Sequence, residues 1–294
     1  MAAQPMQPSQ QALRVQRRLS RERRLSLVVT ACTALLAVIF LWPFMAVLAQ
    51  SFNRLDVVKN PMSIIPTAFT FELYEMIVTR YHLERYFLNT LGVVTTTTVL
   101  STFASALAGY ALAKLPFRGR NIALLLILAV MLLPTDSMLV SKFVVMRQLG
   151  LLNSYWGLVL PSIGGGAFGI FLMRQFMLQI PTEMLESGRI DGCNEFGLFL
   201  RLVLPNMKAS VAVLAILSLS GSWNSVLWPQ ILISDENMQL IMPAIMRLRN
   251  GMSTDAYATP VTIAAAIVCA LLPLGLYLYS QRFFTAALAG ALKG

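Results

Sequence analysis

The segment 183–195 concentrates the charged groups that could do chemistry in this chain. Four of the 13 acidic residues lie in it: Glu183, Glu186, Asp191 and Glu195. Carboxylates can form strong charge-assisted hydrogen bonds with a partner, and Gly192 can take a backbone conformation closed to other residues. Long apolar runs flank the segment, so it cannot lie in hydrocarbon. We therefore expect a compact element at a membrane face, built to dock another molecule.

An ordinary amphipathic surface helix is the alternative interpretation of the same segment. Pro181 suits the start of a helix, and Glu183 in the first turn would interact favourably with the helix dipole. Composition alone leaves both interpretations open.

Polar side chains at the ends of two apolar runs form a second group of candidates. Trp223 and Asn224 come near the end of one run, and Asn89 lies at the start of another. An amide in hydrocarbon needs a hydrogen-bond partner. These residues either line a path for a solute or join neighbouring helices, and both interpretations stay open. For the threonines 95–98, which can bond back to their own helix, packing is favoured.

Residues suited to catalysis or metal binding do not gather anywhere in the sequence. His82 is the only histidine, and Cys32, Cys193 and Cys269 stand apart without C-x-x-C spacing. This pattern predicts no catalytic residue, no metal site, no cofactor and no disulfide framework. The sequence also lacks a G-x-x-x-x-G-K-[ST] loop, so the chain cannot bind ATP through a P-loop.

Six apolar runs must position these residues. With 57% hydrophobic and 12% charged residues, the chain is far from the roughly 25% charged composition of soluble domains. A membrane-spanning helix needs about 20 apolar residues. Runs of that length predict an all-α polytopic membrane protein with six transmembrane helices, at about 26–49, 88–113, 121–140, 155–173, 209–228 and 259–280.

The distribution of basic residues orients the predicted helices. Six arginines and a single acid precede residue 25, and the positive-inside rule then places both termini in the cytoplasm. We expect a cytoplasmic tail over 1–25, a first transmembrane helix with an outer segment over 26–87, and a core with five transmembrane helices over 88–294. The core would contain a cytoplasmic loop, 181–205. The net charge of +10 thus indicates membrane topology and contact with lipid, with no nucleic-acid partner.

The loop 181–205 resembles the E-A-A-x3-G-x9-I-x-L-P signature of ABC-importer permeases. The residues that carry or flank the match are Glu183, Glu186, Ser187, Gly188, Arg189, Asp191, Gly192, Leu204 and Pro205. In that family the segment is the cytoplasmic coupling helix that seats in a groove of the ATPase subunit. Ser187 and Gly188 replace the two alanines and Leu202 replaces the isoleucine, so the docking shape is expected to survive. Gly188 lowers helix propensity by about 1 kcal/mol relative to alanine.

Further fragments in matching order extend the resemblance from about residue 88 to the end. They lie at 108–120, 149–153, 168–176, 180–181, 189–192, 223–224 and 281–294. Together they resemble the sugar-type branch of these permeases, and within it the partner of the maltose-transporter type that ends in a short Lys-Gly tail.

The resemblance implies a type I ABC importer permease fold in the plasma (inner) membrane. The chain would form half of a pore for a sugar or oligosaccharide. Its implied partners are a second permease subunit, two ATPase subunits that hydrolyse the ATP, and an extracytoplasmic solute-binding protein. A permease for a polyol or glycerol-phosphate-type solute is the alternative within this class. Two alternatives lie outside this class: a membrane-embedded enzyme, and a channel or scaffold without energy coupling. The enzyme would need converging acid, base or metal ligands, which the apolar runs do not offer. The channel or scaffold would show no ATP-dependent uptake.

Overall fold

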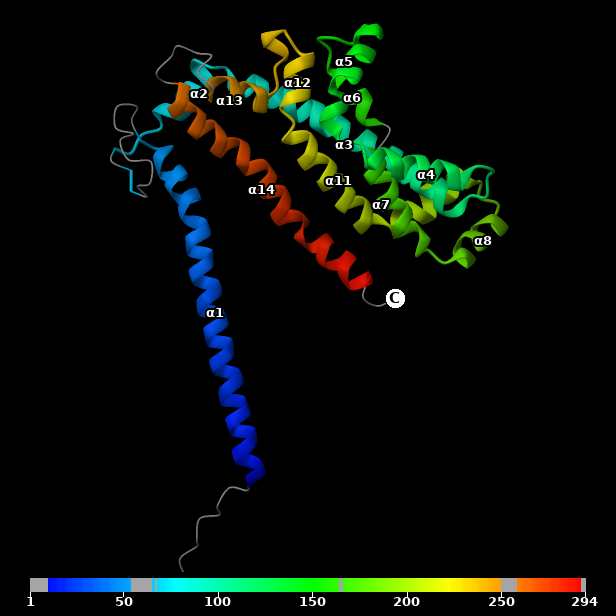
Figure 1. Cartoon of the computed structure of the whole chain (residues 1–294), viewed down its shortest axis with the longest axis horizontal. Helices are drawn as coiled ribbons and strands as arrows, with labels where there is room; N and C mark the ends of the chain where they lie inside the picture. Colours follow the sequence, from blue (N-terminus) through cyan, green and yellow to red (C-terminus); the bar gives the residue numbers. More distant parts are fainter. Residues whose placement is uncertain (1–9, 54–64, 67, 164–165, 250–257, 292–294) are drawn as a thin grey trace, which may run out of the picture. The chain divides into compact units, whose positions relative to one another are not determined.

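The computed structural model describes residues 10–53, 65–66, 68–163, 166–249 and 258–291. Across these ranges every regular element is a helix, which confirms the predicted all-α class (Figure 1). The chain divides into two compact units, Met1–Leu73 and Tyr74–Gly294. The boundary falls inside the short helix α2 (Glu72–Thr79).

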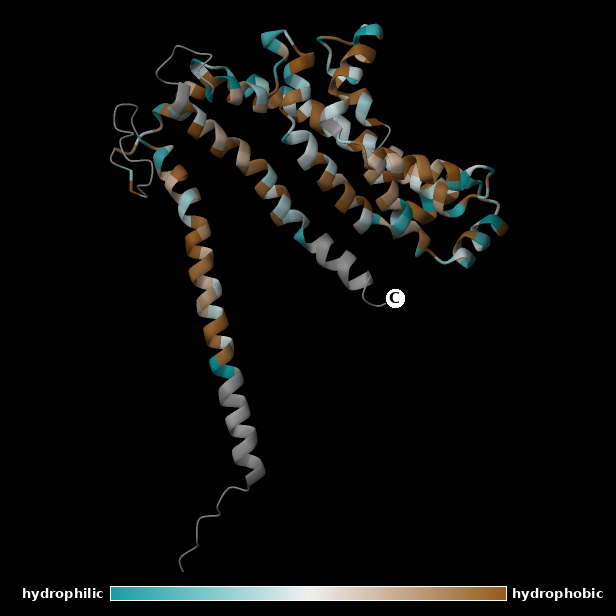
Figure 2. Cartoon of the chain, in the orientation of Figure 1, coloured by the Kyte–Doolittle hydropathy of each residue, from teal (hydrophilic) through white to brown (hydrophobic). Residues whose placement is uncertain are grey.

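The first unit contains one long helix, α1 (Gln10–Gln50). Its part Arg23–Gln50 is long and apolar enough to cross a membrane, and Figure 2 shows mostly apolar colour along this part, with paler turns between. The transmembrane helix predicted at 26–49 lies within these bounds.

Helix α3 (Leu83–Lys114) is the central element of the second unit. It packs against four other helices, which are α6 (Tyr155–Ile163), α7 (Gly166–Leu178), α11 (Lys208–Trp223) and α13 (Ile241–Arg249). Because α3 touches elements from most of the unit, a displacement at one end of this helix can reach distant parts of the chain.

Small residues allow α3 and α7 to approach closely. A Cβ atom on Gly109 would lie 2.8 Å from the Cβ of Met173, and one on Gly169 would lie 2.6 Å from the Oγ of Ser105. Close backbone approach at small residues is a common basis of helix association in lipid. Ser101 and Ser218 are joined by a 2.8 Å hydrogen bond between α3 and α11.

Three of the six predicted transmembrane helices are single long helices. The runs at 26–49, 88–113 and 259–280 lie in α1, α3 and α14 (Ala258–Ala291). The run at 121–140 is not one helix, because α4 covers only Arg120–Met131, about 18 Å at 1.5 Å per residue. Pro134 disfavours helical geometry at the residue before it. The chain continues as a 3-10 turn (Thr135–Met138) and α5 (Leu139–Gln148).

Neither of the two remaining predicted transmembrane helices is one straight helix over its whole length. Helices α6 and α7, which share the run predicted at 155–173, meet at 40°. The segment Glu195–Asn206 precedes the run predicted at 209–228 and meets α11 at 84°. The run predicted at 209–228 ends at Trp223, and a separate helix, α12 (Leu227–Leu232), follows. If each bent pair counts as one span, the described part of the chain holds up to five candidates. Six transmembrane helices are therefore not confirmed.

Two buried clusters stabilise the two halves of α3. One surrounds Tyr110 near the C-terminal end of α3 and joins α7 to the segment after it. The other surrounds Val93 and joins α3 to α6 and α12. The first cluster positions the charged segment 181–205, and the second positions the cavities described below.

Candidate functional site

The charged segment forms two short helices beside the C-terminal end of α3. Helix α8 (Thr182–Ile190) is followed by a turn and by α9 (Glu195–Leu198). A π-helical turn (Phe199–Val203) and α10 (Leu204–Asn206) then lead into α11. Such π-helical turns occur often at functional sites.

Helix α8 has one buried face and one exposed face. Leu185 and Gly188 are buried, whereas the exposed residues are Thr182, Glu183, Glu186, Ser187, Arg189 and Ile190. Ile190 is 86% exposed, so the exposed face combines carboxylates with a large apolar side chain. A charged rim around an apolar anchor is typical of a surface that binds another protein. Ile190 was not among the sequence-based candidates, because an isolated isoleucine in a sequence does not reveal its exposure.

Gly188 allows α8 to pack tightly against the segment that follows it. A Cβ atom at this position would lie 2.5 Å from Leu198 Cδ2 and 2.7 Å from Leu202 Cδ1. The glycine therefore lowers helix propensity but makes room for two leucine side chains. Its departure from the alanine of the family signature has a structural reason in this chain.

Gly192 terminates α8 in a left-handed backbone conformation, with φ at 85°. Its N–H donates to the Arg189 carbonyl at 3.0 Å, and the Cys193 N–H donates to the Gly188 carbonyl at 3.0 Å. These two hydrogen bonds form a Schellman motif, which needs a residue that tolerates positive φ. After the turn, the Asn194 side chain caps α9 by accepting from the Gly197 N–H.

Helix α3 holds both ends of α8 by polar contacts. The Lys114 ammonium donates to the Ile180 carbonyl at 2.6 Å, just before α8 begins. Beyond α8, the Tyr110 hydroxyl donates to Glu195 Oε2 at 2.8 Å, and Arg189 Nε donates to Glu195 Oε1 at 2.8 Å. The hydrogen bond to Glu195 raises the pKa of the Arg189 guanidinium. No local sequence pattern signals these contacts, so the roles of Tyr110, Lys114 and Glu195 as anchors were not predicted.

Leu204 and Pro205 lie on the return path to α11. Leu204 packs against the buried cluster around Tyr110, and Pro205 is exposed at the start of α10. The end of the signature therefore shapes the bend into α11, while its beginning supplies the exposed face.

Trp223 and Asn224 are neighbours in sequence but differ in environment. Trp223 is 1% exposed, and its ring packs edge-on against Phe87 with centroids 5.6 Å apart. Asn224 is exposed, donates to the Ser220 carbonyl at 2.8 Å and lines a cavity of about 490 Å³.

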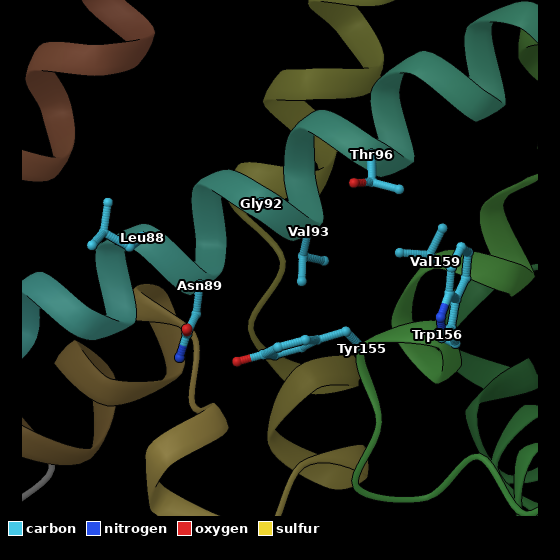
Figure 3. Close-up of a pocket in the computed structure, with 8 residues that line it drawn as sticks. All are labelled: Leu88, Asn89, Gly92, Val93, Thr96, Tyr155, Trp156 and Val159. Atoms are coloured by element: carbon cyan, nitrogen blue, oxygen red, sulfur yellow. The ribbon is translucent and has the colours of Figure 1, made fainter.

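Asn89 lines a second cavity, of about 330 Å³, between α3 and α6. Its amide donates to the carbonyls of Asn237 at 2.9 Å and Gln239 at 3.1 Å. Figure 3 shows Tyr155 extending along this cavity with its hydroxyl on the side of Asn89, and Trp156 beside Val159 at the far end. The Asn89 donors are thus engaged by backbone carbonyls of residues 237 and 239, and its side-chain oxygen stays available to the cavity.

Metal-ligating side chains do not cluster in the parts of the chain that the structure describes. No group of three His, Cys, Asp or Glu residues there could hold a metal ion. Cys32, Cys193 and Cys269 are free thiols.

The long apolar helices and the charged segment between them define an all-α integral membrane protein. Residues 101–285 match the family described as binding-protein-dependent transport system inner membrane component. The chain belongs to this family of ABC-importer permeases, as the sequence resemblance predicted. The Lys-Gly end at 293–294 lies outside the described residues.

Curated relatives match over nearly the whole chain. The arabinooligosaccharides transport system permease protein AraQ of Halalkalibacterium halodurans is 30% identical over 275 residues, which is 92% of this chain and 97% of the relative. The polygalacturonan/rhamnogalacturonan transport system permease protein YtcP of Bacillus subtilis is 28% identical over 93% of this chain and 100% of its own length. The sn-glycerol-3-phosphate transport system permease protein UgpE of Yersinia pestis is 31% identical over 85% and 90%.

The fold is shared with a solved structure. That structure is a bacterial ABC transporter involved in the import of the acidic polysaccharide alginate, with a TM-score of 0.75 and 21% identity, covering 89% of this chain and 96% of that one. The match confirms the type I ABC importer permease fold predicted from the sequence.

Proposed function

We propose that this chain is the permease subunit of an ATP-driven importer for a sugar or oligosaccharide, and that α8 couples its pore to a separate ATPase. The exposed face of α8, held at both of its ends by α3, is the observation that carries the proposal. Relatives named for arabinooligosaccharides and polygalacturonan support the class of solute. The permease named for sn-glycerol 3-phosphate keeps the alternative solute open.

Docking would use the charged and apolar residues of the exposed α8 face. Glu183 and Glu186 would pair with basic or hydrogen-bonding groups in a groove of the ATPase, and Ile190 would bury its side chain there. The remaining partners are a second permease subunit, a second ATPase subunit and an extracytoplasmic solute-binding protein. Both termini and the segment 181–205 would lie on the cytoplasmic side of the inner membrane.

Coupling would run along α3. Closure of the ATPase subunits would displace α8, and the Lys114 and Tyr110 contacts would transmit this displacement to the C-terminal end of α3. Val93, next to both cavities, lies 21 residues earlier, about 32 Å along the helix. Docking surface and cavities would therefore communicate through one continuous element.

Asn89 and Asn224 would contribute to the solute path from the cavities they line. Asn224 has its side-chain oxygen available, because its amide nitrogen donates to Ser220. Trp223 would not line the path, since its side chain is buried. It would stabilise the end of α11 that precedes Asn224.

Reconstitution of the complete importer in proteoliposomes tests this function. The partner permease, the ATPase and the solute-binding protein encoded by neighbouring genes would be included. Radiolabelled arabinotriose, digalacturonate and sn-glycerol 3-phosphate would be offered separately, with ATP or with a non-hydrolysable analogue. ATP-dependent accumulation of a saccharide is expected. Accumulation of glycerol phosphate alone would support the alternative solute. Equal accumulation with and without hydrolysable ATP would exclude an ATP-driven importer.

A further inference from the structure

The cavity that Asn224 lines contains a cation without an acidic partner. Lys142 of α5 reaches into it, with its ammonium 5.0 Å from the ring centroid of Trp228 of α12. Within the described ranges no Asp or Glu forms an ion pair with Lys142. A cation over an indole face is attracted to the ring, which orients the side chain but leaves its charge uncompensated.

Hydroxyl and amide groups form the polar part of the remaining lining, among apolar side chains such as Leu139 and Leu158. They come from α3, α6, α11 and the turn after it: Thr97, Ser162, Ser222, Asn224 and Ser225. Each hydroxyl can donate one hydrogen bond and accept others, so the set matches a solute with several hydroxyls of its own. The Trp228 indole N–H is also buried and has no hydrogen-bond partner among the described residues. A buried donor of this kind is usually satisfied by water or by a ligand.

We propose that this cavity binds the anionic group of a polyhydroxylated solute. Lys142 pairs with a carboxylate or a phosphate, and the surrounding hydroxyl and amide groups bind the hydroxyls of the same molecule. A partly buried cation is stabilised by a counter-charge, and the described protein residues supply none. The proposed function then makes this cavity a subsite of the import path, and its solute an acidic sugar or a polyol phosphate.

The cavity is separate from the docking surface on α8. Thr97 lines the cavity and Lys114 holds the start of α8. Both residues lie on α3, 17 residues apart, about 25 Å at 1.5 Å per residue. Substitutions at Lys142 can therefore change solute binding without touching the surface that would meet the ATPase.

Direct binding measurements on the assembled importer test the assignment. The complex, in phosphatidylcholine nanodiscs without ATP and without solute-binding protein, would be titrated with digalacturonate, sn-glycerol 3-phosphate and neutral galactobiose. Tryptophan fluorescence and ligand-detected NMR would report binding. At least one acidic probe should bind about tenfold or more tightly than galactobiose, and its identity would distinguish a carboxylate from a phosphate.

Three variants isolate the charge of Lys142. Lys142→Met removes the charge but keeps an unbranched stem, and it should weaken binding of the acidic probe about tenfold without affecting galactobiose. Lys142→Arg should restore most of the affinity. Arg147→Met is the matched control, because Arg147 is an exposed cation on the same helix outside the cavity, and its affinities should stay unchanged.

Several results would overturn the assignment. They are equal affinity for digalacturonate, glycerol phosphate and galactobiose, no saturable binding of any probe, an unchanged affinity in Lys142→Met, and an equal loss in Arg147→Met. Complete inhibition by phosphatidylglycerol in the nanodisc would assign the site to a lipid headgroup instead. Because binding requires no ATP, Lys142-dependent binding without ATP-driven uptake would refute the proposed function and keep the site. ATP-driven uptake together with equal affinities for the three probes would refute the site and keep the proposed function.

Discussion

The Tyr110 hydroxyl donates a 2.8 Å hydrogen bond to Glu195 and so joins α3 to the start of α9, across 85 residues of sequence. Tyr110 is only 2% exposed, and its ring lies 5.6 Å from that of Phe199. Glu195 also accepts from Arg189 near the end of α8. The exposed helix is therefore fastened to the membrane-spanning core through a buried tyrosine.

Tyr110→Phe should weaken coupling without preventing assembly. The substitution removes one hydrogen bond to a charged group, worth about 1.5–3 kcal/mol, and keeps the ring that packs on Phe199. We expect the ATPase to co-purify normally while uptake per ATP hydrolysed falls several-fold. Tyr277→Phe, at an exposed position of α14, serves as the control. An unchanged ratio of uptake to hydrolysis in Tyr110→Phe would show that this contact has no part in coupling.

Glu186→Lys should release or uncouple the ATPase while leaving the permease in the membrane. Breaking a buried, charged contact at an interface costs on the order of 2–5 kcal/mol, which weakens docking by tenfold or much more. Co-purified ATPase and solute-stimulated hydrolysis are the measurements. Glu75→Lys reverses an exposed charge on α2 and should leave co-purification unchanged. Normal values for both measurements in Glu186→Lys would show that the segment 181–205 is only a surface loop.

Gly192→Val should abolish stimulated ATP hydrolysis, whereas Gly192→Asn should keep most of it. The Gly192 backbone has φ at 85°, and a Cβ atom there would meet nothing within 4 Å. The penalty therefore comes from backbone conformation alone. A left-handed conformation costs an ordinary residue about 1–2 kcal/mol, and asparagine tolerates it better. Equal activity of the two variants would contradict this explanation.

Asn224→Leu should reduce transport while assembly and basal ATP hydrolysis stay largely intact, because Asn224 is exposed in a cavity. Trp223→Ala provides the contrast. Removing a buried aromatic side chain typically costs 3–5 kcal/mol, so its main effect should be loss of the assembled complex. Size-exclusion chromatography and uptake assays separate the two effects. Loss of assembly in Asn224→Leu would identify Asn224 as a packing residue.

The N-terminal tail should be cytoplasmic. A cysteine placed at position 10, in a background without Cys32, Cys193 and Cys269, should resist an impermeant thiol reagent in intact cells. A cysteine at position 60, in the predicted outer segment, should react. Equal labelling at both positions would overturn the orientation drawn from the arginines of the tail.

The amino-acid sequence by itself determined the fold class and the family. Apolar runs long enough to span a bilayer identified α1, α3 and α14, because hydropathy along a helix depends on composition alone. The order and spacing of residues 186–205 identified the exposed helix, because capping and turn formation at Gly192 depend on neighbouring residues. The continuity of the apolar runs was predicted less well. α4 stops before Pro134, the run at 155–173 is bent, and the run at 209–228 is interrupted after Trp223, since hydropathy does not record where a helix breaks.

The tertiary structure decided which side chains meet and which are buried. Tyr110 reaches Glu195 across 85 residues, and Lys114 reaches Ile180 across 66. The burial of Trp223 beside the exposed Asn224 likewise follows from the packing of α11 against α3. Neighbouring sequence sets propensity and periodicity, but contacts between distant residues exist only once the helices have packed, and each packed arrangement satisfies many such contacts at once.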